Sequence, residues 1–525
     1  MDKGGIVAAG HKATAEAGAE VLRAGGNAVD AAVAAVCTAF IAEPVLTGPG
    51  GGGFLLLREP DGKSVLYDGF ASMPKYRPEE LRHLDFREIP VDFGDTVQTF
   101  HIGQASVATP MLMAMLFQAQ RKHGCMPMLE VVQPAINAAR QGVILNQLQA
   151  GFIKLLEPIL MPEDNCRTLY APNSNLLQKG EKFSNSNWAH LLELLALDGI
   201  DEMYYGDVAK SIAKACTPGG LLRLDDLSAQ HGHIRSPLQR EAAGGILLTN
   251  PPPSSGGCLI AFSLHILEEL QKRMSDISPR ILLAEALRSA SCSRSLNFDR
   301  HIHQTGIQNT FLSPVNFHQA IKVAMKRLRS PKPSCQREPK NRHGSTSHIS
   351  VIDRNGMAVS ITTSNGEGSG IVVPGTGIHL NNMLGEEDIN PCGFHKLLPG
   401  ETLSSMMAPT IFVRNGKPAL ILGSGGSNRL RGAILQVFYR HILAGENIES
   451  AVCAPRMHNE DHILDCEPDV LTSTERSFLQ SIGWELRDWS KQSIYFGGVH
   501  AISIDGRGEL YGAGDPRRGG SVAWA

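Results

Sequence analysis

The sequence predicts a mixed fold of the α/β (α+β) class, and two observations lead to this prediction. Apolar residues recur with helical spacing in the first half of the chain, whereas the residues after 346 form short alternating runs separated by turns. With 42% apolar and 19% charged residues in a chain of 525, a large globular core is expected. The net charge of -3 favours neither nucleic acid nor a membrane surface as a partner.

The expected elements follow in chain order. Two helices at 15–23 and 28–41 are separated by Gly25-Gly26-Asn27, residues that favour a helix end followed by a new N-cap. A glycine loop at 47–53 then leads into a strand at 54–57. Helical patterns recur at 110–122, 131–140, 188–197, 280–289 and 430–444. Strands are expected at 346–353, 358–363, 378–380, 410–414 and 418–422, with a closing hairpin of 499–504 and 509–512.

The cysteines and the N-terminus bear on metal or redox motifs and on cellular location. Ten scattered cysteines include no C-x-x-C pair, so the sequence supports neither a zinc module nor a redox motif. The first residues lack the apolar core of a signal peptide, and the alanine-rich stretch at 28–41 is too short to span a bilayer. We therefore expect a cytoplasmic protein.

Thr346 is the first candidate functional residue. It follows a basic, proline-broken segment at 326–345, which we interpret as a solvated loop. It opens a run in which Ile349 and Val351 alternate with polar residues, as in a strand with one buried face. Cleavage before Thr346 would place its hydroxyl beside a free α-amine that acts as its base. Threonine is also common in strands, so this local pattern alone does not establish a nucleophile.

Two glycine-rich segments are candidates for anion binding. Residues 48–53 lack the Lys and Ser/Thr of a P-loop and lead into a strand, which argues against a nucleotide site. Residues 423–427 (GSGGS) follow a strand and precede a helix, so their N–H groups could form an oxyanion hole. A tight turn that requires glycine explains the same segment. His348, near Thr346, is more typical of a hydrogen-bonded core histidine than of a catalyst.

Taken together, the motifs resemble the γ-glutamyltransferase family. The matches run in order along nearly the whole chain, at 8–11 (AAGH), 25–28 (GGNA), 50–54 (GGGGF), 251–257 (PPPSSGG), 346–351 (TSHISV), 403–406 (LSSM), 423–426 (GSGG) and 515–520 (DPRRGG). The resemblance implies a four-layer αββα N-terminal-nucleophile hydrolase sandwich. It also implies a precursor that cuts itself between Ser345 and Thr346.

The resemblance also implies two cleavage fragments and an acyl-transfer reaction. A large fragment, 1–345, and a small fragment, 346–525, would form one intertwined catalytic unit, and a dimer of that unit is compatible with the family. Thr346 Oγ would attack a small-molecule amide, and the backbone N–H groups of Gly425 and Gly426 would hold the oxyanion. The acyl group would then pass to water or to an amine. No metal or cofactor takes part.

The substrate contacts of the family transfer incompletely. An arginine in an R-E-x-A-P segment normally pairs with the substrate α-carboxylate, but the matching residues 68–74 (DGFASMP) contain none. Met383 replaces the acidic or amide residue that holds the α-amine. Arg429, otherwise an ordinary surface residue at a helix start, could hold a carboxylate in another pose. The residues that remain as substrate-binding candidates are Ser364, Asn365, Glu386, Ser404 and Ser405.

The missing substrate contacts change the activity that we expect. Losing the ion pair costs about 2 to 5 kcal/mol in binding, so efficient glutathione turnover is not expected. Residues 381–386 (NNMLGE) look like the branch that includes oxamate amidohydrolases and some acylases. We predict an autoprocessing amidohydrolase or acyltransferase that cleaves γ-glutamyl-type or related small carboxylate amides through a threonyl acyl-enzyme.

Two alternatives stay open at this point. One is an oxamate-type or lactam-side-chain amidohydrolase with no γ-glutamyl activity. The other is an uncleaved, non-catalytic binding relative, which the unusual segment 289–294 (SASCSR) favours because related enzymes continue a helix there.

Overall fold

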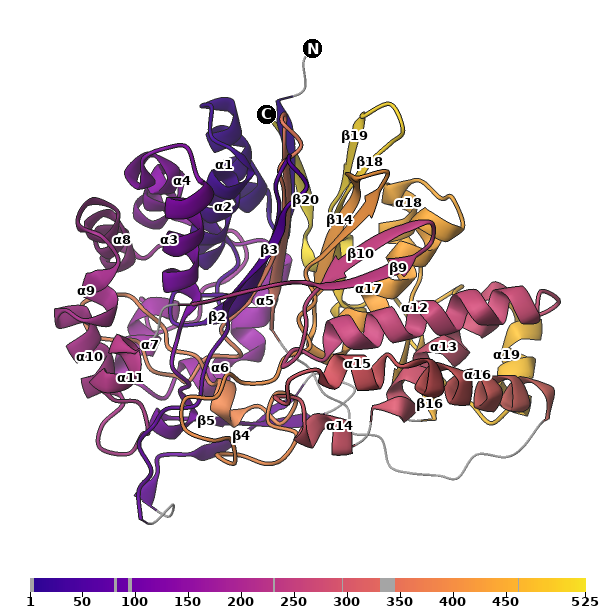
Figure 1. The fold of residues 1–525 in the computed structure, drawn as a ribbon. Coiled ribbons are helices and arrows are strands. Elements are labelled where there is room, and N and C mark those ends of the chain that lie inside the picture. The colour runs from indigo at the N-terminus through magenta and orange to yellow at the C-terminus, as the bar shows by residue number, and fades with distance from the viewer. Residues whose placement is uncertain are drawn as a thin grey trace.

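The computed structural model describes residues 4–79, 83–92, 97–229, 232–294, 296–330, 345–460 and 462–525. Within these ranges, two antiparallel sheets pack face to face and helices cover each outer face, which gives the four layers seen in Figure 1. The predicted αββα sandwich is therefore confirmed. Both sheets combine strands that precede Thr346 with strands that follow it.

The sheets have the following strand orders. The first sheet runs β20 (Ser521–Trp524), β1 (Gly5–Ala9), β11 (Ser347–Asp353), β12 (Ala358–Ser364), β2 (Gly52–Arg58), β3 (Ser64–Gly69) and β8 (His233–Arg235). The second runs β19 (Leu510–Ala513), β18 (Gly498–Ile504), β14 (Lys417–Gly425), β13 (Thr410–Arg414), β10 (Gly245–Thr249) and β9 (Leu238–Ala242). Smaller sheets are β15 (Met457–Glu460) with β16 (Ile463–Cys466) and β17 (Glu485–Asp488), β4 (Arg87–Asp92) with β5 (Val97–Ile102), and β6 (Val143–Ile144) with β7 (Lys182–Phe183).

The helices divide between the two outer layers and their margins. On the side of the first sheet lie α1 (Lys12–Arg23), α2 (Ala28–Ala42), α3 (Leu112–His123), α4 (Met128–Gln141), α5 (Gln147–Leu155), α6 (Glu157–Leu160), α7 (Asp164–Tyr170), α8 (Ser186–Asp198), α9 (Asp201–Tyr204), α10 (Asp207–Ala215) and α11 (Leu224–Ser228). On the side of the second lie α12 (Gly256–Arg273), α13 (Pro279–Ser293), α14 (Leu296–Arg300), α15 (Ile307–Phe311), α16 (Pro314–Arg329), α17 (Leu430–Phe438), α18 (Ile448–Cys453) and α19 (Ser473–Ser481). Among the described helices, none has both the length and the apolar character needed to cross a bilayer.

The start of α2 shows how local sequence sets an element. Asn27 caps the helix by accepting from the backbone N–H groups of Val29 and Asp30, and the Asp30 carboxylate accepts from the Asn27 N–H in return. This reciprocal box satisfies donors that a helix start otherwise leaves open. The predicted N-cap is confirmed.

Strand β11 carries Thr346 at its entrance and is buried on both faces, so the expectation of a single buried face is wrong. Ile349 and Val351 pack into the apolar layer beneath α1 and α2, while His348 and Ser350 face the second sheet. There the hydroxyl of Ser350 donates to the carbonyl of His500 in β18 at 3.0 Å. On the neighbouring strand, Ser360 donates to the carbonyl of Leu422 in β14, also at 3.0 Å.

His348 lies in this polar layer between the sheets. Its ring nitrogens lie 2.8 Å from the Thr362 hydroxyl and 3.0 Å from the Ser350 hydroxyl. Burial holds the pKa of His348 well below its usual value, so the ring is neutral. The interpretation of His348 as a hydrogen-bonded core residue is confirmed.

Two expected elements are wrong. Residues 378–380 form only isolated bridges, because the chain there crosses beside the glycine loop without a partner strand. Residues 326–329 of the supposed loop are the last turn of α16, where Arg327 Nε donates to the buried Glu285 carboxylate at 2.6 Å. This buried ion pair extends the helix into the basic segment, and residues 331–344 of that segment lie outside the described residues.

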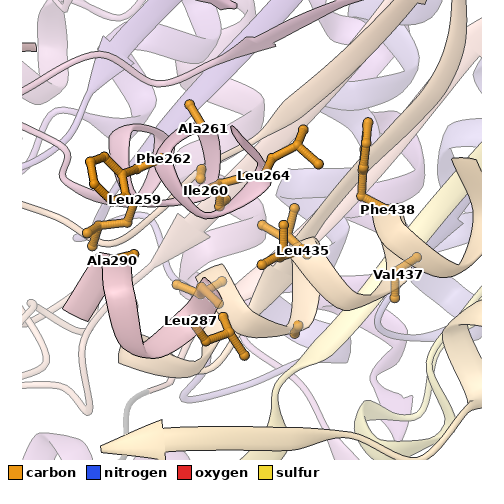
Figure 2. Close-up of a cluster of buried hydrophobic side chains, with 14 of the residues drawn as sticks. Leu259, Ile260, Ala261, Phe262, Leu264, Leu287, Ala290, Leu435, Val437 and Phe438 are labelled. Carbon is orange, nitrogen blue, oxygen red and sulfur yellow. The ribbon is translucent and has the colours of Figure 1, made fainter. Parts of the chain in front are cut away.

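The helical layer over the second sheet fixes the position of α17. Figure 2 shows apolar side chains of α12, α13 and α17 packed into one cluster, with Phe262, Leu287, Leu435 and Phe438 among them. Burying each such side chain contributes about 1.5 to 3 kcal/mol. The turn at 426–429, which leads directly into α17, is therefore held against a rigid layer.

Candidate active site

The peptide bond between Ser345 and Thr346 lies buried at the entrance to β11. Thr346 is 4% exposed, and its hydroxyl donates to the carbonyl oxygen of Ser345 at 2.6 Å. The hydroxyl of Ser364, at the end of the neighbouring strand β12, donates to the same oxygen at 2.5 Å. Two hydroxyl donors therefore polarise the one carbonyl that a nucleophile at Thr346 would attack.

The groups on either side of this peptide are also held. The Ser345 N–H donates to the Glu367 carboxyl group at 3.0 Å, and Arg518 Nη1 donates to the Thr346 carbonyl oxygen at 3.0 Å. One residue further on, the Ser347 hydroxyl donates to the buried Glu43 carboxylate at 2.6 Å. The backbone around Thr346 is thus fixed by side chains from distant parts of the chain.

Glycines of β14 approach the same peptide. A Cβ atom at Gly425 would lie 2.2 Å from the Thr346 carbonyl oxygen, so only glycine fits at this position. Gly426 follows with φ +117°, a left-handed conformation that also favours glycine. The predicted turn between strand and helix is present, but it begins at Gly426, because Gly423 to Gly425 complete β14.

Two cavities meet at Ser345. The first is lined by polar and acidic groups with an apolar floor, contributed by Phe70, Thr346, Ser364, Met383, Glu386, Asp388, Ile389, Ser405, Met406, Met407, Ser427 and Leu430. The second is lined by Phe152, Leu155, Leu156, Glu367, Gly426, Arg429, Ile494, Tyr495 and Arg518. One cavity is therefore acidic and the other carries two arginines.

Three carboxyl groups gather beside the first cavity. Burial raises the pKa of Glu367 to about 8; repulsion from Asp388 adds to this, and the Ser345 N–H opposes it. The pKa of Glu386 is raised well above its ordinary value by burial and by repulsion from Glu367 and Asp388. A cation that entered this cavity would relieve the repulsion and lower both pKa values.

The remaining predicted residues divide between the cavities and their surroundings. Ser405 and Glu386 line the first cavity together with Thr346. Ser404 lies one residue away, where its hydroxyl donates to the Ile389 carbonyl at 2.8 Å. Asn365 turns away from Thr346, and its Nδ2 donates to the His379 carbonyl at 3.2 Å beside the glycine loop. The sequence predicted Asn365 as a substrate-binding residue, but the structure places it beside the site and not among the residues that line either cavity.

Several site residues were not found from the sequence. Glu367, Glu43 and Arg518 contact the peptide around Thr346, yet they lie 21, 303 and 172 residues from it in the chain. The only local signal is a glutamate flanked by glycines directly after a strand. Arg429 is 2% exposed, so the expectation of an ordinary surface residue is wrong. Among the residues that the structure describes, no group of three or more His, Cys, Asp or Glu side chains is arranged to hold a metal ion.

The layering and the glycine turn at the entrance of a central strand define a four-layer αββα sandwich. The crystal structure of cephalosporin acylase from Bacillus halodurans has the same fold, with a TM-score of 0.83 at 23% identity, covering 99% of this chain and 96% of that one. The crystal structure of Helicobacter pylori gamma-glutamyltranspeptidase matches 60% of this chain and 90% of that one, with a TM-score of 0.53 at 24% identity.

Sequence comparison identifies the family. The gamma-glutamyltranspeptidase family matches residues 14–525, and the chain belongs to this family. The glutathione hydrolase proenzyme of Escherichia coli K12 is 31% identical over 541 residues, which cover 98% of this chain and 90% of that protein. The acylase ACY 1 proenzyme of Pseudomonas sp. V22 is 28% identical over 516 residues, covering 97% and 91%. The chain is thus an enzyme of the hydrolase and acyltransferase type that acts on amide bonds.

Proposed function

We propose that this chain is a precursor that cleaves itself before Thr346 and then uses Thr346 as the nucleophile of an amidohydrolase or acyltransferase. The observation that carries the proposal is the carbonyl group of Ser345, whose oxygen receives both the Thr346 and the Ser364 hydroxyls. Polarising an amide carbonyl beside a buried hydroxyl prepares the bond for acyl transfer to oxygen.

The proposed maturation has two steps. Thr346 Oγ attacks the carbonyl carbon of Ser345, the C–N bond breaks, and the hydroxyl proton ends on the Thr346 nitrogen, leaving an ester. Water then hydrolyses the ester, which gives a Ser345 carboxylate and a Thr346 with a free hydroxyl and a free α-amine. The products are residues 1–345 and 346–525, and their shared sheets support the view that they stay together as one unit.

Catalysis on a substrate repeats this chemistry. The Thr346 α-amine takes the proton from Oγ as the oxygen attacks the substrate amide, and the amine leaving group departs with that proton. Backbone N–H groups at Gly425 and Gly426 are proposed to hold the oxyanion, which the close approach of Gly425 to Thr346 supports. Water or a second amine then accepts the acyl group.

The proposed substrates are γ-glutamyl-type or related small carboxylate amides. Asp388 and Glu386 line the cavity that contains Thr346, and a bound ammonium group would lower the raised pKa of Glu386 and so favour its charged form. Ser405 adds a hydroxyl to the same wall. The first cavity is therefore suited to the ammonium end of an amino acid substrate.

A second candidate is an oxamate-type or lactam-side-chain amidohydrolase without γ-glutamyl activity. The observation that favours it is the position of Phe70 and Met383, which both line the first cavity. Phe70 lies in the segment without the family's arginine, and Met383 replaces the family's acidic or amide residue. An apolar wall there weakens binding of an amino acid and suits a simpler acyl group. Sequence similarity to an acylase proenzyme is consistent with this alternative.

The test begins with the purified wild-type protein and a Thr346→Ala variant. On a denaturing gel the wild type should give bands of about 37 and 19 kDa, in proportion to fragment length, and the smaller should begin Thr-Ser-His-Ile by N-terminal sequencing. The variant should stay intact. A wild-type chain that remains one band after long incubation would instead support a non-catalytic binding relative. Matured protein is then assayed against γ-glutamyl anilides, glutathione, oxamate and acyl-lactams, and a strong preference for glutathione would contradict the assignment of the pocket.

A further inference from the structure

Arg429 is a buried arginine whose guanidinium group lacks the hydrogen-bonded carboxylates that Arg456 and Arg517 have. Its side chain is 2% exposed, and none of its three guanidinium nitrogens has a hydrogen-bond partner among the described residues. By contrast, Arg456 lies 2.6 Å from Asp515, and Arg517 pairs with both Glu467 and Asp515. The charge of Arg429 helps to lower the pKa of Glu460 to about 2, but no carboxylate is hydrogen-bonded to Arg429 among the described residues. Its donors are therefore candidates for pairing with an anionic ligand.

The immediate surroundings hold the Arg429 side chain in place. Its guanidinium carbon lies 4.2 Å from the centre of the Tyr495 ring, and Tyr495 is itself anchored by a 2.8 Å hydrogen bond to Asp465. The ring covers one face of the guanidinium and leaves its edge available, because a stacked arginine can still donate in its own plane. The Tyr495 ring therefore orients the guanidinium group of Arg429 and brings no negative charge to it.

Arg429 lines the second cavity described above, next to the peptide bond that the proposed function cleaves. Arg518 lines the same cavity, and so do Ser345 and Gly426. Burial lowers the pKa of Arg518 to about 10, and repulsion from Arg429 acts in the same direction. Two cations thus approach one another across a cavity that reaches the carbonyl group under attack.

The position of Ser345 says which part of a substrate would enter this cavity. Ser345 is the acyl half of the peptide bond before Thr346, and it lines both cavities. An acyl group transferred from a substrate to Thr346 Oγ would occupy the same place. One end of it would then face the acidic cavity and another would face Arg429.

We propose that Arg429 binds the free carboxylate of the substrate's acyl half and so replaces the arginine that is missing from residues 68–74. The inference rests on the proposed function, since it concerns the acyl group carried by Thr346. The planar guanidinium edge matches a carboxylate with two parallel hydrogen bonds. The apolar side chains of Phe152, Leu156 and Ile494 on the cavity wall would contact the methylene groups of a short dicarboxylic chain.

The kinetic test compares one substrate with its uncharged form. Matured wild type, Arg429→Met and Arg429→Lys are assayed with glutaryl 4-nitroanilide and with the methyl ester of the same anilide. Arg429→Met should raise KM for the acid by about 30-fold or more, as expected for a lost buried ion pair. It should leave KM for the ester within about twofold of wild type, and Arg429→Lys should fall between. Equal KM changes for acid and ester would overturn the proposal.

Arg431→Met is the matched control. Arg431 lies two residues further on, in the first turn of α17, and is 6% exposed, but it does not line either cavity. A general loss of packing would affect both variants, whereas a carboxylate contact affects only Arg429→Met. If Arg431→Met changes the acid-to-ester ratio as strongly as Arg429→Met does, the specific role of Arg429 is refuted.

A binding measurement separates this inference from the proposed function. Glutarate, which has no amide bond to cleave, is titrated by calorimetry into the purified wild-type protein and into Arg429→Met, because an uncleaved variant would keep Ser345 in the place of the acyl group. Glutarate binding that weakens at least tenfold in Arg429→Met supports the anion site even if no amide is turned over, and in that case only the proposed function fails. Unchanged or undetectable glutarate binding in both proteins refutes the anion site, whatever the processing gel shows.

Discussion

Replacing Ser364 with alanine tests most directly whether the Ser345–Thr346 peptide bond is arranged for self-cleavage. The Ser345 carbonyl oxygen has two hydroxyl donors, Thr346 at 2.6 Å and Ser364 at 2.5 Å. When Thr346 attacks, its own hydroxyl stops donating, so Ser364 is the hydroxyl that remains to stabilise the developing oxyanion. Removing one such donor costs about 2.7 to 4 kcal/mol, a factor of about 100 to 1,000 in rate.

The assay is a time course of precursor conversion on a denaturing gel. Ser364→Ala should reach half conversion about 100 to 1,000 times more slowly than wild type. Ser106→Ala is the control: the Ser106 hydroxyl is also buried, but it donates to the Gly103 carbonyl at 2.7 Å and does not contact the scissile peptide. Conversion of Ser364→Ala at the rate of Ser106→Ala would refute the oxyanion role.

Two further predictions concern the same peptide. Because burial raises the pKa of Glu367 from 4.5 to about 8, the folded protein keeps a proton that the unfolded chain loses within this window. The contribution of Glu367 to the free energy of unfolding therefore falls by up to about 1.4 kcal/mol per pH unit as pH rises from 4.5 towards 8. Glu367→Gln, made in the uncleaved Thr346→Ala background, should flatten this dependence in urea denaturation at about pH 5.5 and about pH 7.5, and identical slopes for both proteins would contradict the burial of a protonated carboxyl group. Gly425→Ala would place Cβ 2.2 Å from the Thr346 carbonyl oxygen, so this variant should process much more slowly or not at all on the same gel. Gly151→Ala, where a Cβ would meet nothing within 4 Å, should process normally, and normal processing of Gly425→Ala would show that the backbone there yields.

Local signals in the sequence predicted the elements whose causes are local. Asn27 caps α2 because the cap depends on residues two and three positions away. Strands β11 and β12 were expected nearly to the residue from alternation and the intervening turn. By contrast, the second burial face of β11 could not be predicted, because it is created by a sheet whose strands lie elsewhere in the chain.

In the candidate site too, the residues with a local sequence signal were predicted and those held by distant contacts were not. Thr346 and Gly425 were expected from motifs and Ser364 as a substrate contact, and the structure brings all three to one peptide bond. The ionisable groups of the site were harder to predict from the sequence, because Arg518 contacts Thr346 across 172 residues and no spacing rule connects the two. Arg429 was expected at the surface because an arginine at a helix start usually lies there, and its burial depends on the packing of Tyr495 over it.

The hydroxyl groups between the two sheets have a mechanical consequence. An interface made only of methyl groups would let one sheet slide over the other at small cost, since dispersion contacts are not directional. Ser350 and Ser360 instead reach across to backbone carbonyls of β18 and β14, and each hydrogen bond is lost if the layers shift. These bonds therefore set the lateral alignment of the sheets, and with it the distance between the end of β14 and the residue that begins β11.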